Sequence, residues 1–275
     1  MTATDNADTF RTDVQRSATI VSDLQQTLNA ARVILFLAWS DVRSRYKRTI
    51  LGPLWLTLGT LLGTAGLGYI WSELFHLDRA TFVPALTSGL IVWQFLSGCI
   101  TEAPTTFNRQ AGIIRNMEVP LSIHPAQMVT KHFINLLHTA PVFVVVAVLM
   151  NVHVGWPTLL FIPCLLLVTA NLAWITFLLS ILGARFRDLE YLVAAVMPLL
   201  MFLSPVMYRP NFLPISGHLL WFNPLSHLIE LLRYPLLGTI PPGFIVWTSI
   251  GMAVVGWGVV LILFHRVHSR IAFWI

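Results

Sequence analysis

Residues 41–53 read Asp-Val-Arg-Ser-Arg-Tyr-Lys-Arg-Thr-Ile-Leu-Gly-Pro and join a polar N-terminal arm to the first long apolar run of the chain. A helix over residues 33–51, which advances about 100° per residue, gathers apolar side chains on one side and basic side chains on the other. The apolar stripe consists of Leu35, Trp39, Val42, Tyr46 and Ile50, and the basic face consists of Arg43, Arg45, Lys47 and Arg48. Gly52 and Pro53 then end the helix. The pattern predicts an amphipathic helix that lies in a membrane interface before the chain turns to cross the membrane.

The function of this basic face is open between two interpretations. Lys and Arg flank membrane spans on the cytoplasmic side, so a juxtamembrane anchor that only fixes topology would explain the face. A platform against which a cytosolic partner protein pushes would explain it equally well. The residue pattern alone does not separate these two roles.

The composition is that of an all-α integral membrane protein. Hydrophobic residues make up 56% of the 275 residues and charged residues 11%, and the mean hydropathy is +0.74. That is too little charge for the surface of a soluble domain of this length. The net charge of +5 does not indicate nucleic-acid binding, because the basic residues cluster at the ends of apolar runs, where they set topology. Residues 1–30 lack the apolar core of a secretory signal, and we expect them to form a cytosolic arm.

Six apolar runs are long enough to cross a bilayer, which takes about 20 residues. They are residues 54–75, 82–100, 133–152, 157–183, 191–208 and 244–265, within a transmembrane domain that covers residues 31–275. Residues 211–240 are also apolar, but three prolines interrupt them and they contain Glu230 and Arg233. A charge at the centre of a span costs about 2.5–3.5 kcal/mol. We therefore expect two short re-entrant helices between the fifth and sixth spans.

The distribution of charge supports this topology. With the N-terminus in the cytoplasm, only Arg79, Arg209 and Arg233 lie outside, and the other fourteen Lys and Arg residues lie inside. A seventh crossing would move Arg266 and Arg270 outside and weaken this bias. The count therefore predicts six spans with both termini in the cytoplasm.

The sequence offers no catalytic, cofactor-binding or metal-binding site. His132 and His138 do not share a helical face, and neither they nor His265 and His268 have the carboxylate partners of a zinc site. The two cysteines, Cys99 and Cys164, lie inside apolar runs without metal-type spacing, and we expect both to be packing residues.

Four acidic residues near the predicted spans fall into two groups. Glu102 and Glu118 are expected to be solvated or paired with Arg109 and Arg115. Glu73 and Glu230 stay candidates for function, because ionisable residues in membrane segments are functional by default.

A set of short motifs resembles one known family. They are Arg45-Tyr-Lys-Arg-Thr-Ile-Leu-Gly-Pro-Leu-Trp55, Gly112-Ile-Ile-Arg-Asn-Met-Glu-Val-Pro-Leu121, Arg187-Asp-Leu189, Leu203-Ser-Pro-Val-Met-Tyr208, Asn223-Pro224 and Arg270-Ile-Ala-Phe-Trp274. In this order and spacing the chain resembles the membrane subunit of a type-2 ATP-binding-cassette exporter of the polysaccharide-exporting branch. That branch moves O-antigen, capsule, teichoic acid or related lipid-linked glycans across the cytoplasmic membrane.

The resemblance implies a half-transporter in the inner membrane. Two copies of the chain would form the membrane path, and two copies of a separate nucleotide-binding subunit would bind ATP and Mg and hydrolyse the ATP. The chain itself contains no G-x-x-x-x-G-K-[ST] phosphate loop, so we expect a transporter subunit and not an enzyme. Its other contacts would be membrane lipids and the lipid-linked glycan, with no nucleic acid.

The resemblance also implies roles for particular residues. Contact with the nucleotide-binding subunit would involve Arg43, Arg45, Lys47, Arg48, Arg109, Arg115 and Glu118. Arg187 and Asp188 would couple the fourth and fifth spans, or else form a charged stop with an N-cap for the fifth span. The rings of Trp55, Tyr69, Phe202 and Tyr208 would line the substrate path and stack on sugar rings, although plain helix packing also explains each of them. Trp39, Trp71, Trp156 and Trp247 fall near predicted interfaces and are expected to be belt anchors.

Two other functions remain open at this point. One is an export permease of the same superfamily for drugs or other hydrophobic small molecules. The other is an intramembrane transferase, which would need a cluster of catalytic acids, bases or metal ligands near one membrane face.

Overall fold

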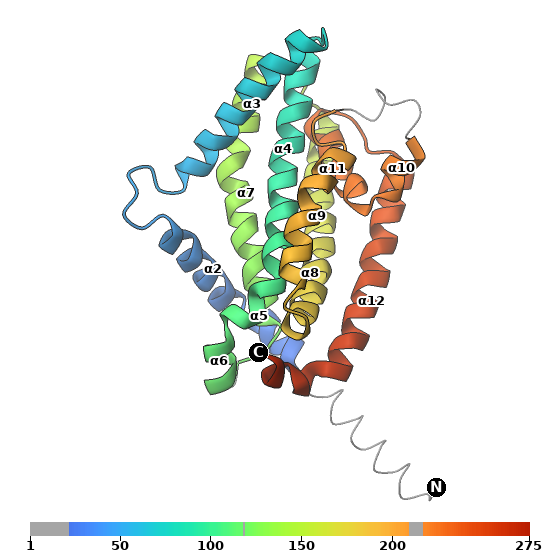
Figure 1. Cartoon of the computed structure of the whole chain (residues 1–275). Helices are drawn as coiled ribbons and strands as arrows, with labels where there is room; N and C mark the ends of the chain where they lie inside the picture. The colour runs from blue at the N-terminus through green and yellow to red at the C-terminus, as the bar shows by residue number, and fades with distance from the viewer. Residues whose placement is uncertain (1–21, 118, 209–216) are drawn as a thin grey trace, which may run out of the picture.

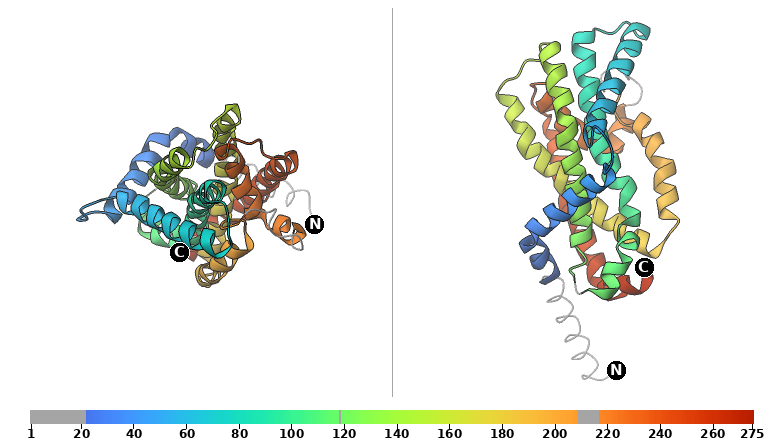
Figure 2. Two further views of the ribbon diagram at one scale, coloured as in Figure 1. Left: turned by 90° about the horizontal axis from the view of Figure 1, so that it is seen from above. Right: turned by 90° about the vertical axis from the view of Figure 1, so that its left-hand side faces the viewer.

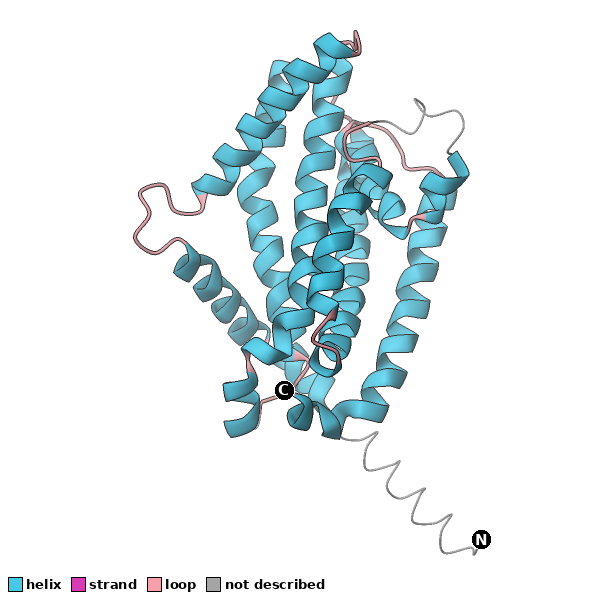
Figure 3. Cartoon of the chain, viewed as in Figure 1, coloured by secondary structure: helices cyan, strands magenta, loops and turns pink. Residues whose placement is uncertain are grey.

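The computed structural model describes residues 22–117, 119–208 and 217–275, and within them it contains helices and no strands (Figure 3). Residues 22–29 are helical and precede α2. The remaining elements are α2 (Ala31–Arg45), α3 (Leu54–Leu74), α4 (Arg79–Glu102), η1 (Ala103–Thr105), α5 (Thr106–Arg109), α6 (Ala111–Asn116), α7 (Ile123–Leu149), η2 (Trp156–Leu160), α8 (Phe161–Arg185), α9 (Leu189–Leu203), α10 (Gly217–Phe222), α11 (Pro224–Leu236) and α12 (Gly243–Trp274).

The long helices form one elongated bundle with two distinct ends (Figure 1). The end that we call the α6 end holds α5, α6, the turn from α8 to α9 and the C-terminus. The opposite α11 end holds the turn from α3 to α4, the connection from α7 to α8, and both α10 and α11. Helix α9 starts at the α6 end and runs back toward α11, in contact with α4.

Among the described residues, five helical segments are long and apolar enough to cross a membrane. They are α3, residues 79–116 (which begin with α4), α7, residues 156–185 (η2 with α8), and α12. The fifth predicted run, residues 191–208, forms α9, which is apolar but has only 15 residues and ends at Leu203. Its end is explained by Pro205, because a proline disfavours helical backbone at the preceding residue, and Ser204 is extended with ψ 153°.

Two helices reach beyond the predicted spans. Helix α7 begins at Ile123, ten residues before the expected start, and α12 continues to Trp274 instead of ending near residue 265. The polar residues in these extensions concealed them from a hydropathy argument. In α7 such residues, among them Gln127 and Lys131, are nevertheless buried by contacts with other elements.

Helix α4 lies near the centre of the bundle when the bundle is seen end-on (Figure 2). Most of its side chains from Phe82 to Ile100 are buried, and they join one core with residues of α7, α8 and α11. By contrast, α3 and α12 leave large apolar side chains such as Leu62, Ile70 and Val254 exposed. Apolar surface of this kind fits helices that face lipid.

The predicted interface helix is present in part, with different bounds. Helix α2 ends at Arg45, not at residue 51, because Arg48 takes a positive φ of 71° and the Thr49 hydroxyl donates to the Tyr46 carbonyl at 2.8 Å. The buried stripe is Ile34, Ala38 and Val42, and it packs against α7 near Ile134.

Val42 and Tyr46 of the expected stripe take part in this contact, whereas Ile34 and Ala38 replace Leu35 and Trp39 in it. Leu35 and Trp39 are about half exposed and Ile50 is fully exposed. The small side chain of Ala38 lets α2 approach α7 closely, and the larger residues lie at the sides of that contact. The Asp41 carboxylate, which could pair with Arg45, accepts a hydrogen bond from Gln127 Nε2 of α7 at 2.7 Å.

Residues 217–236 form two short helices, as the prolines predict. Pro224 occupies the first turn of α11, where its missing N–H costs nothing. The Asn223 side chain caps the helix by accepting from the Leu225 N–H at 3.0 Å. Both helices lie at the α11 end of the bundle.

Candidate functional site

A cluster of charged side chains joins α4, α5 and α7 at the α6 end. Glu102, the last residue of α4, accepts hydrogen bonds from Lys131 Nζ at 2.5 Å, Arg109 at 2.8 Å and His132 Nε2 at 3.0 Å. Lys131 and His132 are buried, so the paired carboxylate is what makes their burial tolerable. Gly98 of α4 leaves room for the His132 ring, because a Cβ there would lie 2.5 Å from Nδ1. We call Glu102, Arg109, Lys131 and His132 the Glu102 cluster.

The pairing of Glu102 with Arg109 was expected from the sequence, and the structure confirms it. The contribution of Lys131 and His132 was not expected, because both precede or begin the apolar run of α7. The carboxylate oxygens already accept three hydrogen bonds. This occupancy suits Glu102 to holding three elements together and not to abstracting a proton from a substrate.

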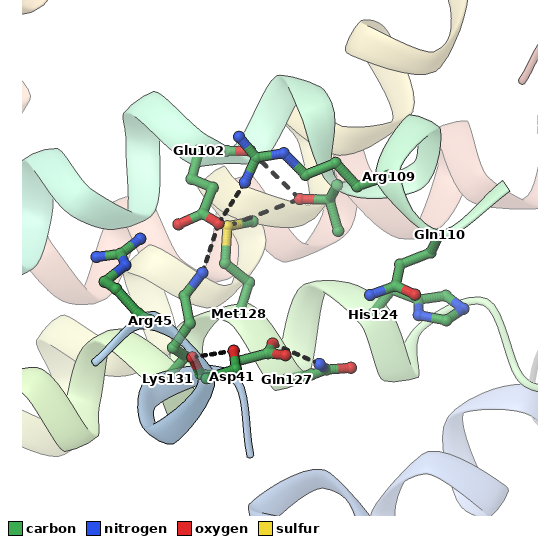
Figure 4. A pocket seen from close by; sticks show the side chains of 11 residues that line it. Asp41, Arg45, Glu102, Arg109, Gln110, His124, Gln127, Met128 and Lys131 are labelled. Carbon is green, nitrogen blue, oxygen red and sulfur yellow. Dashed lines mark hydrogen bonds and ion pairs between the residues drawn. The ribbon is translucent and has the colours of Figure 1, made fainter. Parts of the chain in front are cut away.

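A polar cavity of about 370 Å³ adjoins this cluster (Figure 4). Helix α2 contributes Asp41, Ser44 and Arg45 to its lining, and α7 contributes residues that include His124 and Gln127. The bond from Gln127 to Asp41 crosses this cavity wall and ties α2 to the first turns of α7.

The predicted basic face, which we continue to call the basic face of α2, consists of Arg43 and Arg45 of α2 and of Lys47 and Arg48 just beyond its end, and it remains open to its surroundings. Arg43, Arg45, Lys47 and Arg48 are all exposed. They line or adjoin a second hollow of about 670 Å³ between the end of α2 and the residues that lead into α3. The predicted partner-contact residues on α2 are thus available to a partner protein or to lipid headgroups.

The connection from α4 to α7 presents a second exposed surface at the same end. Helix α6 has no buried residues, and Ile113 and Met117 beside it are exposed. Arg115 donates a hydrogen bond to the Ile275 carbonyl and so joins α6 to the C-terminus. Glu118, the remaining predicted contact residue, lies outside the described residues.

Helix α5 is fixed more firmly than α6. Asn108 Nδ2 donates to the Gly183 carbonyl of α8 at 3.4 Å. Gly183 also approaches the backbone of Pro104 so closely that a Cβ would lie 2.1 Å from its carbonyl oxygen. The path from α4 into α5 is therefore held against α8 by close backbone contact.

Asp23 is a functional candidate that the sequence did not reveal. It is buried, and it accepts hydrogen bonds from the Leu121 N–H at 2.8 Å, the Ser122 N–H at 3.2 Å and the Ser122 hydroxyl. His268 Nε2 of α12 lies 3.5 Å away. Burial raises the pKa of Asp23, but the hydrogen bonds from His268, Ser122 and Leu121 together lower it below its ordinary value. No local motif identifies this residue, because its partners lie about a hundred or more positions away in the chain.

An aromatic pocket of about 590 Å³ lies where the end of α3 faces the end of α9. Its lining consists of Trp71, Phe75, Leu77, Phe82, Phe202, Met207 and Tyr208. Rings of this kind can stack on the apolar faces of sugars or hold apolar ligands. The two functions that the sequence left open for a transporter both fit this lining.

The pocket brings together two of the four predicted substrate-path residues. Phe202 and Tyr208 line it, whereas Trp55 and Tyr69 do not. Trp55 lies in the first turn of α3, far along the helix from the pocket, and Tyr69 carries the Arg79 guanidinium 5.0 Å above its ring. Trp71, which the sequence assigned to an interface belt, takes part in the pocket instead.

Arg187 and Asp188 occupy the turn from α8 to α9, and both are exposed. Asp188 is the N-cap residue of α9, but its side chain makes no capping hydrogen bond. Among the described residues, no group of three His, Cys, Asp or Glu side chains is arranged to hold a metal ion.

The sequence matches the model of a known family of transporter subunits. The family model for ABC-2 type transporters matches residues 32–237, and the chain belongs to this family. It is thus a multi-pass membrane subunit of a transporter whose ATPase is a separate subunit.

Three relatives are named O-antigen export system permease protein RfbA. One from Klebsiella pneumoniae is 27% identical over 249 residues, which cover 87% of this chain and 93% of the relative. A second protein from the same species is 24% identical and covers 72% of this chain and 77% of its own length. A third, from Myxococcus xanthus, is 22% identical and covers 64% of this chain and 68% of its own length.

Proposed function

We propose that this chain is the permease subunit of an ATP-driven exporter of a lipid-linked polysaccharide such as O-antigen. The observation that carries the proposal is the match, over most of both chains, to relatives named O-antigen export permeases. The aromatic pocket supports it, because stacking on ring faces holds a sugar polymer without fixing it at one position.

The proposed topology has six spans, with α9 as the fifth and α10–α11 re-entrant, in the inner membrane. It is supported by a parity argument. Asp23, before the first span, contacts His268, after the last predicted span, so the described segments that flank these two spans lie at the same end of the bundle. This contact requires an even number of crossings, and the five long segments alone give an odd number. Both termini would then be cytoplasmic, at the α6 end.

The proposed assembly contains two copies of this chain and two ATP-binding subunits, which supply the bound ATP and Mg. The basic face of α2 and the exposed α6 would receive the partner. The bond from Gln127 to Asp41 and the Glu102 cluster make α2, the end of α4 and the start of α7 respond together. Nucleotide binding would thereby bias these helices between two arrangements. Arg187 and Asp188 would carry that change from α8 to α9.

The proposed path runs between α3 and α9, with Phe202 and Tyr208 at its α11 end. Opening this path laterally would let the lipid carrier stay in the membrane while the glycan passes. The pocket lining is mostly apolar, which also favours the second candidate, export of hydrophobic small molecules.

The test is deletion of the gene in its host, followed by separate measurement of surface polysaccharide, lipid-linked polymer inside the cell and efflux of hydrophobic dyes. We expect surface polysaccharide to disappear and lipid-linked polymer to accumulate, with dye efflux unchanged. The wild-type chain should restore surface polysaccharide. The same chain should fail to restore it when the ATPase partner lacks its phosphate-loop lysine, and this difference would show that export requires ATP. Loss of dye efflux with normal surface polysaccharide would favour the second candidate instead.

A matched pair of variants then tests the path. Phe202→Ala removes a ring from the aromatic pocket, whereas Tyr69→Ala removes an exposed ring nearby that does not line it. If the pocket handles the cargo, Phe202→Ala lowers export per folded transporter about fivefold, the effect of losing about 1 kcal/mol from one ring contact, and Tyr69→Ala does not. Equal export by the two variants at equal abundance would remove the pocket from the path.

A further inference from the structure

The α11 end contains a charged pair that is almost fully buried. Glu230 and Arg233 lie one turn apart on α11, with 3% and 2% of their surfaces exposed. Arg233 NH1 donates to Glu230 Oε1 at 2.5 Å. A charged pair in such a place costs free energy to desolvate unless further hydrogen bonds satisfy it, so the other contacts of Arg233 indicate what the pair does.

Arg233 also donates to two backbone carbonyls of the segment that follows α9. Its NH2 donates to the Val206 carbonyl at 3.0 Å, and its NH1 donates to the Tyr208 carbonyl at 3.2 Å. Both carbonyls belong to residues 204–208, which we call the post-α9 turn. The planar guanidinium can reach two carbonyls and a carboxylate at once, which a lysine ammonium cannot do with the same geometry.

Two other contacts fix the same turn. Asn223, which caps α11, donates through Nδ2 to the Ser204 hydroxyl at 2.8 Å. Gly89 of α4 lies directly beneath the turn, because a Cβ at this position would lie 2.1 Å from the Val206 carbonyl oxygen and 2.3 Å from Arg233 NH2. Val206 itself is fully buried. The turn is therefore held between α4 and α11 by its backbone.

The side chains of the same turn form one wall of the aromatic pocket. Met207 and Tyr208 line the pocket opposite Trp71 and Phe75 of the α3 end. Arg233 does not line the pocket. The ion pair thus sits behind this wall, where Arg233 contacts the backbone of the turn that carries it.

We infer that Arg233, oriented by Glu230, is a positioning residue that fixes the post-α9 turn and thereby sets the pocket wall formed by Met207 and Tyr208. This inference rests on the proposed function in that it assigns the wall to the export path. The pair acts through the turn and has no contact with the cargo.

The first measurement is geometric and does not depend on the cargo. A cysteine is introduced at Met207 or, on the opposite wall, at Trp71, and its rate of labelling by a small maleimide is measured on the purified full-length protein in detergent. The native Cys99 and Cys164 are buried. With Arg233→Lys we expect labelling at position 207 to change at least about threefold, because the two carbonyl contacts are lost, and labelling at position 71 to stay unchanged.

The second measurement is export per folded transporter. Arg233→Lys and Gly89→Ala disturb the same turn from opposite sides, and each should lower export by about fivefold to tenfold, the range expected for loss of one or two buried hydrogen bonds. Arg79→Lys is the matched control for the first, because Arg79 forms an exposed pair with Glu73. Gly66→Ala is the control for the second, because a Cβ there meets no atom within 4 Å. Combined with Tyr208→Ala, Arg233→Lys should cause little further loss, since both act on one wall.

The outcomes separate the two proposals. If labelling at position 207 does not change in folded Arg233→Lys, or if its export falls only in proportion to abundance, the positioning role is wrong. If the labelling changes as expected but the wild-type chain exports no polysaccharide, the positioning role is supported and the proposed function is wrong. Glu230→Gln, which keeps the shape of the partner, should give the same labelling change in a weaker form.

Discussion

Glu102 accepts hydrogen bonds from two cationic side chains, Arg109 and Lys131, and from His132, and we therefore expect its loss to have the largest effect on the α6 end. In the variant Glu102→Gln, buried Lys131 would lose its charged partner. Breaking a buried pair in this way costs about 3–5 kcal/mol, so we expect folded protein to fall sharply, as measured by detergent-resistant abundance and thermal unfolding. The double variant Glu102→Gln/Lys131→Met should recover much of that loss, because no buried charge is left unpaired. A double variant as unstable as the single one would contradict this explanation.

The basic face of α2 leads to a prediction about coupling. The exposed Arg43 and Lys47 carry charge that no described residue neutralises by an ion pair. Reversing both to Glu should leave folding intact but separate ATP hydrolysis by the complex from export, since the contact with the partner subunit is repelled. The measurement is ATPase activity and export in the same preparation, with Arg32→Glu as a control for charge at the other end of α2. Normal export by Arg43→Glu/Lys47→Glu would return the face to the role of a topology anchor.

At the scale of elements, the helix of residues 22–29 is attached through Asp23, which ties the start of α7 to α12. Asp23→Asn should destabilise the protein by about 1–2 kcal/mol, because a neutral amide accepts weaker hydrogen bonds than a carboxylate from the N–H groups at the N-terminus of α7. The lowered pKa of Asp23 means that its contribution is fully present above the ordinary pKa of 3.8 and is lost as the pH falls through the lower folded-state pKa. Thermal unfolding of wild-type protein should therefore become easier in acid, and the variant should show a smaller dependence over that range. Equal acid dependence in both would exclude this role.

The elements differ in how far sequence could predict them. Long apolar runs predict α3, α8 and α12, because a helix satisfies its backbone hydrogen bonds internally and needs only apolar side chains to face lipid. The start of α7 was missed because its polar residues are buried by contacts with α2 and α4, and such contacts leave no local pattern. The end of α2 could not be predicted, because arginine has no preference for the positive φ that Arg48 adopts. The site is limited in the same way, because contacts between distant segments leave no local pattern. The exposed basic residues could be identified one by one from the sequence. The roles of Asp23, Trp71 and the pocket wall in front of Arg233 depend on contacts between distant segments.

At the scale of the whole molecule, the six-span topology predicts on which side of the membrane each segment lies. Helix α9 is 15 residues long, which spans about 22 Å at 1.5 Å per residue and falls short of the hydrocarbon core of about 30 Å. The post-α9 turn completes the distance in the six-span topology, and its backbone carbonyls are then satisfied inside the protein by Arg233, as the membrane interior requires.

A reporter enzyme that is active only outside the cytoplasm decides between six spans and five. Fused after Ile275 it should be silent, and inserted at Thr239, in the turn after α11, it should be active. A five-span chain would separate the N-terminal segment from the C-terminus and give an active C-terminal fusion, yet it would also break the contact between Asp23 and His268. The variant Asp23→Asn serves as the control: because topology follows the Lys and Arg distribution and not this contact, its reporter pattern should match that of the wild type.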